Sequence, residues 1–169
     1  MKVLFVSDSH GLTSELEKIV EKHQNDVDLF IHCGDSELPP DHPALKKYVV
    51  VAGNCDFDER YTEDLVKKAG DKMIFITHGH KYSVKSNLMK ISYKAREVGA
   101  DIVCFGHSHY LGAEMDRGIL LINPGSIRLP RGRMERTYVI LEIMEKSYDL
   151  HVYDVDKGEL KELAQTFLY

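Results

Sequence analysis

The chain has 169 residues, of which 43% are hydrophobic and 29% are charged. This length fits one domain spanning residues 1–169, and the composition excludes a disordered or fibrous protein. The net charge of −5 disfavours a dedicated nucleic-acid binder, which needs a basic face. No apolar run approaches the roughly 18 residues of a membrane span. Three cysteines without CxxC spacing suit a reducing compartment, so we expect a cytoplasmic protein.

The first two-thirds of the chain alternates short apolar runs with helical or loop segments. The runs that predict buried strands are Val3–Val6, Asp28–His32, Tyr48–Ala52, Met73–Ile76 and Ile102–Phe105. Continuous hydrophobicity of this length is typical of strands covered on both faces in an α/β protein.

Two segments between these runs predict helices. One begins at Ser14, with Glu17 placed three residues later as the partner of a capping box. The other spans Val84–Val98, where apolar residues recur at helical spacing. Gly99 can then adopt the left-handed conformation that ends a helix. Residues 59–70 fit either a short helix or a hairpin that turns at Gly70-Asp71.

The last third of the chain has a different pattern. Short apolar runs, such as Ile119–Ile122, Tyr138–Ile143 and Leu150–Val155, are separated by turn residues such as Asp116-Arg117-Gly118 and Asp156-Lys157-Gly158. Tight turns between short strands indicate antiparallel pairing. Together the two patterns predict an α/β sandwich of two mixed β-sheets flanked by helices.

Each of the first five runs ends in polar residues that can bind metal. These are Asp8-Ser9-His10, Gly34-Asp35, Gly53-Asn54-Cys55-Asp56, His78-Gly79-His80 and Gly106-His107-Ser108-His109. Ligands bind at the carboxyl ends of strands in open α/β sheets, so we expect these residues to meet at one edge. The two-residue spacing of Asp8 and His10, and of His107 and His109, would place each pair on one side of an extended segment.

The candidate ligands are aspartate, asparagine and histidine, which suit Mn, Fe, Ni, Zn or Co better than Ca. Seven candidates exceed what one ion draws from a protein, and Asp35 between them could bridge a pair of ions. The seven are Asp8, His10, Asp35, Asn54, His78, His107 and His109.

The five motifs, in this order, resemble the calcineurin-like metallophosphoesterase family, whose pattern reads D-x-H, G-D, G-N-H/C-D/E, H and G-H-x-H. The short length, Asn123-Pro124-Gly125-Ser126 and the GNCD and THGH motifs look most like its small bacterial and archaeal phosphodiesterase branch. The resemblance covers about residues 1–155 and implies the metallophosphoesterase fold with two divalent ions, Mn, Ni, Co, Fe or Zn. It implies that one ion takes Asp8, His10, Asp35 and His109, and that the other takes Asp35, Asn54, His78 and His107.

The resemblance also implies an enzyme that hydrolyses small phosphate diesters by metal-activated water. Many family members have a histidine after the asparagine to protonate the leaving oxygen, but here the position is Cys55. Its loss favours diesters, whose acidic leaving groups need that proton less, and leaves His80 as the nearest substitute acid. Asp56 joins His80 as a candidate catalytic residue, although hydrogen bonding to the backbone amides of its own turn is the favoured role. The expected substrate contacts are Asn54, His80, Ser126 and Arg128.

The sequence is compatible with two other functions. A binding scaffold is the main alternative, because the retromer subunit with this fold serves protein assembly without appreciable catalysis. All seven ligand positions here keep metal-competent side chains, which a scaffold would not require. A nuclease acting on long nucleic acid is disfavoured by the acidic charge, although a nucleotide fragment could still be a substrate. We expect no membrane partner, and a homo-oligomer is compatible with the sequence.

Overall fold

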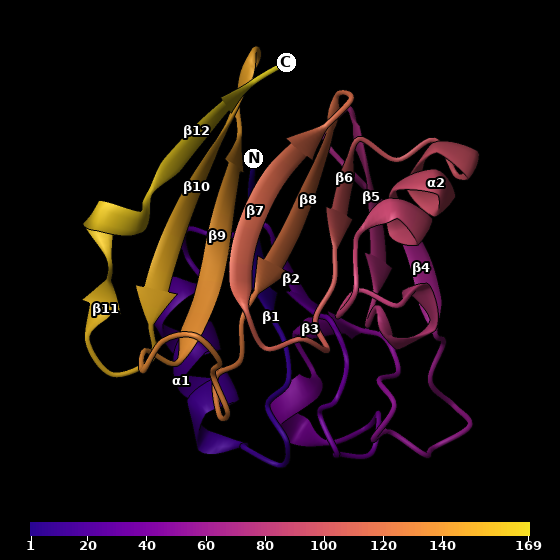
Figure 1. The fold of residues 1–169 in the computed structure, drawn as a ribbon. Helices are drawn as coiled ribbons and strands as arrows, with labels where there is room; N and C mark the ends of the chain where they lie inside the picture. Colours follow the sequence, from indigo (N-terminus) through magenta and orange to yellow (C-terminus); the bar gives the residue numbers. More distant parts are fainter.

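The computed structural model describes residues 1–169, whose strands form two mixed β-sheets that pack face to face (Figure 1). The first sheet contains β1 (Lys2–Val6), β2 (Leu29–His32), β3 (Tyr48–Val50), β9 (Thr137–Ile143), β10 (Ser147–Asp154), β11 (Gly158–Glu159) and β12 (Gln165–Leu168). Its order is β11-β10-β9-β1-β2-β3, and β12 also pairs with β10. The predicted sandwich of two mixed sheets is therefore confirmed.

The second sheet contains β4 (Asp64–Ala69), β5 (Lys72–Thr77), β6 (Ile102–Cys104), β7 (Leu111–Asp116) and β8 (Ile119–Pro124), in the order β4-β5-β6-β8-β7. Two α-helices, α1 (Ser14–His23) and α2 (Met89–Glu97), lie outside the sheets. Three short 3-10 helices complete the structure: η1 (Pro43–Leu45), η2 (His80–Tyr82) and η3 (Lys161–Leu163). No helix has the length and hydrophobicity that crossing a bilayer requires.

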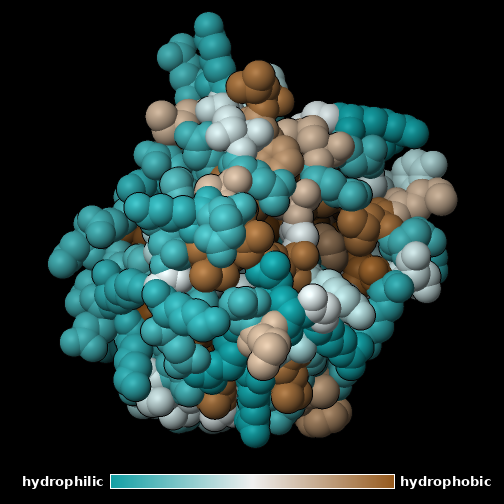
Figure 2. Space-filling model, turned by 60° about the vertical axis from the view of Figure 1, so that its left-hand side comes forward, coloured by the Kyte–Doolittle hydropathy of each residue, from teal (hydrophilic) through white to brown (hydrophobic).

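The central strands are buried on both faces, as their continuous hydrophobicity predicts. In β1, Val3 and Phe5 join the core between the two sheets, whereas Leu4 and Val6 join a second cluster with α1. Alternate residues of β5, β6 and β8 likewise face either the inter-sheet core or a third cluster beneath α2. Hydrophilic residues cover most of the face seen in Figure 2, and hydrophobic residues appear there mainly in hollows.

All five predicted runs form strands, and the antiparallel pairing of the last third is confirmed. Residues 59–70 take the hairpin alternative, because β4 pairs with β5 across a turn at Gly70. Strand β7 was not predicted, since its sequence LGAEMD contains no β-branched or aromatic residue.

The two helix starts differ from the prediction. The prediction of a capping box between Ser14 and Glu17 is wrong. The Ser14 hydroxyl donates to Glu15, and Thr13 is the N-cap residue of α1. The second helix begins only at Met89, whose backbone N–H donates to the Asn87 side chain 3.0 Å away. Residues 84–88 therefore precede α2 as an irregular segment. Gly99 has the expected left-handed backbone, with φ of 67°.

Candidate metal centre

The loops that follow β1, β2, β5 and β6 gather at the carboxyl ends of these strands (Figure 1). Backbone hydrogen bonds tie them together. The Asp8 N–H donates to the Gly34 carbonyl at 3.0 Å, and the Gly106 N–H donates to the His78 carbonyl at 3.0 Å. Each of these bonds joins two loops of one sheet, and the His107 N–H, which donates to Asp8 Oδ2 at 3.1 Å, joins the two sheets. The candidate ligands of both sheets are therefore held at one edge, as expected from the sheet topology.

The backbone at this edge is not extended. Six non-glycine residues here have left-handed backbones with φ between 43° and 66°, and they are Asp8, His10, Asp35, Glu37, His107 and His109. The expected reason for their spacing, a period of two in extended segments, is therefore wrong. Left-handed non-glycine residues are uncommon and cluster where surrounding structure imposes them for function.

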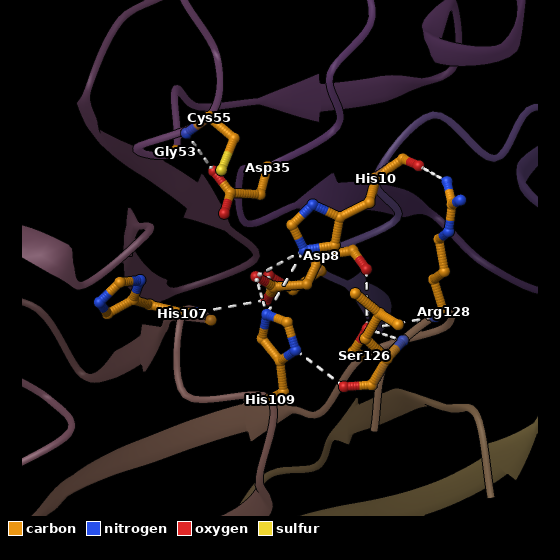
Figure 3. Close-up of polar contacts among 12 residues, drawn as sticks. Asp8, His10, Asp35, Gly53, Cys55, His107, His109, Ser126 and Arg128 are labelled. Carbon is orange, nitrogen blue, oxygen red and sulfur yellow. Dashed lines mark hydrogen bonds and ion pairs between the residues drawn. The ribbon is translucent and has the colours of Figure 1, made fainter. Parts of the chain in front are cut away.

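The side chains form three overlapping donor sets, in each of which the ligand atoms lie within 4.8 Å of one another. The sets are Asp8 with His10 and His109, Asp8 with Asp35 and His78, and His10 with Asp35 and Cys55. In Figure 3, Asp8, His10 and His109 point toward one another, beneath Asp35 and Cys55. Two carboxylates, Asp8 and Asp35, each belong to two sets and so link them.

Three imidazoles are oriented in the same way. His78 Nδ1 lies 2.7 Å from the Cys33 carbonyl oxygen, His109 Nδ1 lies 2.8 Å from the Leu129 carbonyl oxygen, and His10 Nδ1 lies 2.6 Å from Glu37. These oxygens only accept, so Nδ1 donates in each case and Nε2 faces the cluster. Metal-binding histidines are typically fixed by such a bond from the other ring nitrogen. Glu37 was not anticipated from the sequence.

Asp8 has one oxygen anchored and one free. Its Oδ2 accepts hydrogen bonds from the Ser7 hydroxyl at 2.6 Å and the His107 N–H at 3.1 Å. Its Oδ1 is buried and makes no well-aligned hydrogen bond, although His109 Nε2 is 3.0 Å away. His78 Nε2 is also buried without a well-aligned hydrogen bond, although Asp35 Oδ2 is 3.2 Å away. Asp8 Oδ1 and His78 Nε2 lie 3.8 Å apart, and each can offer a lone pair, so the two unpartnered atoms fit a cation between them.

The electrostatics favour positive charge at this position. Burial lowers the pKa of His78, but the pairing with Asp35 and Asp8 outweighs burial and holds it above the ordinary value. The close contact with the Asp8 carboxylate likewise raises the pKa of His109. Burial raises the pKa of Asp35, but His78 outweighs this effect and holds it below the usual range. The carboxylates thus attract a proton or a cation, and the oxygen and nitrogen donors fit a divalent transition metal.

Two predicted ligands lie outside these sets. The exposed Asn54 side chain donates to Cys55 Sγ at 3.3 Å. The His107 ring centroid is 5.2 Å from that of His78, and the ring points away from Asp8 in Figure 3. Burial, His78 and Lys85 lower the pKa of His107 to about 4, so its imidazole is neutral at neutral pH. Both residues border the cluster without entering it.

Asp56 is the hub of the loops on the other side of the cluster. Its carboxylate accepts backbone N–H bonds from Asp35 at 2.7 Å, Glu37 at 2.7 Å and Gly53 at 2.8 Å. The carboxylate therefore holds the turn that carries Asn54 against the loop that carries Asp35.

Ser126 and Arg128 approach the centre from the loop after β8. Ser126 is fully buried, and its hydroxyl donates to the Asp8 carbonyl at 2.8 Å and accepts from two backbone N–H groups. Direct substrate contact by Ser126 is at odds with this burial. The exposed Arg128 guanidinium donates to the His10 carbonyl and reaches the edge of the cluster (Figure 3).

The two remaining site residues are half-buried. The His80 ring centroid lies 5.5 Å from that of His78, and its buried Nδ1 has no hydrogen-bond partner. Burial lowers the pKa of His80, and the charge of His78 adds to this effect. Burial and the neighbouring Asp35 carboxylate raise the pKa of the Cys55 thiol to about 11.

Gly106→Ala should weaken metal binding. A Cβ at residue 106 would overlap the Ser7 hydroxyl and lie 2.5 Å from Asp8 Oδ2, so Asp8 must move. Because supporting contacts of this kind commonly contribute about 10–100-fold to metal affinity, we expect a loss of that size in a titration with Mn²⁺. Gly112→Ala is the control, since a Cβ there meets nothing within 4 Å. Equal Mn²⁺ affinity in the two variants would contradict the importance of this packing.

Comparison with known proteins places this geometry in a family. Residues 1–146 match the family model described as the calcineurin-like phosphoesterase superfamily domain. The chain is 50% identical over 163 residues to the probable metallophosphoesterase YsnB of Bacillus subtilis, covering 96% of each protein. It is 26% identical over 171 residues to the phosphodiesterase YfcE of Escherichia coli K12, covering 84% of this chain and 88% of that one.

A solved structure agrees with the fold. The crystal structure of a predicted phosphoesterase from Streptococcus pneumoniae TIGR4 superimposes with a TM-score of 0.94 at 36% identity, covering 99% of this chain and 97% of that one. The sequence motifs, the fold and the metal-competent edge therefore agree, and the chain belongs to the calcineurin-like phosphoesterase superfamily.

Proposed function

We propose that the chain is a phosphodiesterase that depends on two divalent metal ions. The observation that carries the proposal is the pair of buried carboxylates, Asp8 and Asp35, each of which is shared between two donor sets. Paired catalytic ions are about 3.5–4 Å apart, a distance that a shared carboxylate can bridge. The similarity to the E. coli protein named phosphodiesterase YfcE supports the reaction class.

The residues divide between the two ions as the motifs suggest. Asp8, His10, Asp35 and His109 would hold one ion, and Asp35, Asn54, His78 and His107 would hold the other. Bound ions of this kind supply activated water and stabilise charge on the phosphoryl oxygens. The chain itself fixes the orientation of His10, His78 and His109 through their Nδ1 bonds.

The acid–base residues favour diesters. Because burial lowers the pKa of His80, this histidine is mostly neutral at neutral pH and is a poor source of protons. The Cys55 thiol, with a pKa raised to about 11, is a still weaker acid. An alkyl monoester needs a proton on its leaving oxygen, whereas a diester with an acidic leaving group does not. His80 would then serve mainly to donate a hydrogen bond to the phosphate.

The other site residues would bind the phosphate or position the loops that carry the metal ligands. The exposed Asn54 and Arg128 would contact the phosphate, and the Arg128 side chain reaches the edge of the cluster (Figure 3). Asp56 and Ser126 would act through the backbone: Asp56 by holding the Asp35 loop, and Ser126 by holding the Asp8 carbonyl. We therefore assign both of them positioning roles.

Cys55→Ala should lose less than about tenfold in diester turnover, or under about 1.4 kcal/mol in barrier. The bond that Cys55 gives to Asp35 Oδ1, at 2.8 Å, comes from the backbone N–H and survives the substitution. Metal content should stay at the wild-type value, as measured by elemental analysis beside the turnover assay. A thousandfold loss with unchanged metal content would make the thiol a chemical participant.

The proposal is tested by a substrate panel with the purified protein in Mn, Ni, Co, Fe or Zn. The panel contains bis(4-nitrophenyl) phosphate, 4-nitrophenyl phosphate and cyclic nucleotides. We expect metal-dependent turnover with kcat/KM higher for the aryl diester than for the monoester. A higher value for the monoester would overturn the diester assignment. Turnover of no substrate with any metal would overturn the enzymatic function in favour of the binding scaffold.

A further inference from the structure

An apolar groove of about 510 Å³ lies between the β7–β8 hairpin and the irregular segment before α2. Val84 and Leu88 line it from that segment, and Phe105 and Leu121 line it from the sheet. The volume falls within the range of small-molecule sites, which are mostly apolar with a few placed polar groups.

An exposed glycine of β7, Gly112, borders the groove. Gly112 lines the groove, and a Cβ built on it would meet nothing within 4 Å. Its φ is ordinary, so the backbone does not require glycine at this position. The space is therefore room for another molecule that a larger residue would fill.

The groove and the metal centre share the loop after β6. Ser108, which lines the groove, lies in sequence between His107 and His109. Asn123, on the same lining, donates to Ser108 Oγ at 2.9 Å and to the Gly106 carbonyl at 3.0 Å. One wall of the groove is thus the loop that carries two of the candidate ligands.

The charges of the groove suit an anion that is joined to an apolar group. Two cations, Lys85 and Arg131, line it with one acid, Glu114, and the Arg131 backbone N–H donates to the His109 carbonyl at 3.1 Å. The other cavity beside the cluster, about 570 Å³ in volume, is lined instead by Glu37, Asp56 and Asp58 and would repel an anion. Charge complementarity therefore selects the groove.

We propose that this groove binds an apolar, aryl-sized ester group of the substrate while the phosphate lies at the metal centre. The inference rests on the proposed function and narrows it to phosphate esters with an apolar substituent. The apolar side chains from the segment before α2 and from the sheet would cover the substituent. Lys85 and Arg131 would attract the negatively charged phosphate.

The test is the binding of two phosphonates that cannot be hydrolysed, methylphosphonate and benzylphosphonate, to the metal-loaded protein by calorimetry. Burial of the aryl group should make benzylphosphonate bind at least about tenfold more tightly to the wild-type protein. Gly112→Trp should fill the groove and reduce this preference to about twofold or less. Leu88→Ser should reduce it several-fold, and serine is well tolerated there because Leu88 is the N-cap of α2.

Lys67→Trp is the matched control, because it adds a tryptophan to the exposed β4 strand at the opposite edge of the sheet from β7. It should keep the wild-type preference. Equal affinities for the two phosphonates in the wild-type protein would overturn the inference, as would an unchanged preference in Leu88→Ser even where Gly112→Trp does not fold. A benzyl preference without turnover of any diester would uphold the groove as a binding site and overturn only the proposed activity.

Discussion

Asp35→Asn is expected to lower metal affinity by roughly a hundredfold or more, since loss of a supporting contact alone costs about 10–100-fold. Asp35 shares one donor set with Asp8 and His78 and another with His10 and Cys55, so the substitution removes negative charge from both. Asparagine keeps the shape of the side chain, and its carbonyl oxygen can still accept the bond from the Cys55 N–H. The fold should therefore persist while metal content and diester turnover fall together.

Asp71→Asn provides the control for the loss of one carboxylate. Asp71 lies in the exposed turn between β4 and β5, and its ion pair with Lys72 is 3.9 Å long. This variant should keep wild-type metal content and turnover in parallel assays. If Asp35→Asn retains the wild-type metal content and near-wild-type turnover, Asp35 does not bridge two ions.

Asp56→Ala is expected to destabilise the metal-free protein by about 3 kcal/mol. Three backbone N–H groups, those of Asp35, Glu37 and Gly53, lose a charged acceptor, and each unsatisfied group of this kind costs about 1–3 kcal/mol. Water can reach part of these loops, so the expected destabilisation is smaller than three full penalties added together. Urea unfolding monitored by circular dichroism measures the loss, and metal affinity should fall with it because the Asp35 loop is released.

Asp58→Ala separates this role from the general loss of an acidic side chain in the same loop. The Asp58 carboxylate pairs with Arg60 at the surface and accepts its only backbone bond from Arg60. Its substitution should leave the urea midpoint close to that of the wild type, because exposed ion pairs contribute little. If the midpoint of Asp56→Ala also matched the wild type, Asp56 would not be the hub of these loops.

The overall architecture follows from the sequence because its signals are local. Val3–Val6 and Ile102–Phe105 are apolar throughout, and strands of this kind become buried on both faces whatever their neighbours. The topology then brings Asp8 and His78 to one edge without further information, since both follow strands whose carboxyl ends meet there.

The details of the site depend on contacts between distant residues, which a local pattern does not contain. Glu37 orients His10 across 27 positions, and its only signal is an acid two residues after Asp35. The left-handed His107 and His109 are bonded to distant loops, since the His107 N–H donates to Asp8 and the His109 carbonyl accepts from the Arg131 N–H. Spacing alone contains no sign of these contacts and suggested extended chain. The apolar groove likewise could not be predicted, because α2 begins only at Met89 and the preceding Val84 and Leu88 line the groove.

The number of divalent ions per chain tests the account most directly. The protein is stripped with chelator, equilibrated with Mn²⁺ and freed of unbound metal, and its content is measured by inductively coupled plasma mass spectrometry against protein concentration. We expect two ions per wild-type chain and at most one in Asp35→Asn. One ion per wild-type chain, or none, would contradict the bridging of two ions by Asp35 and with it the proposed dinuclear centre.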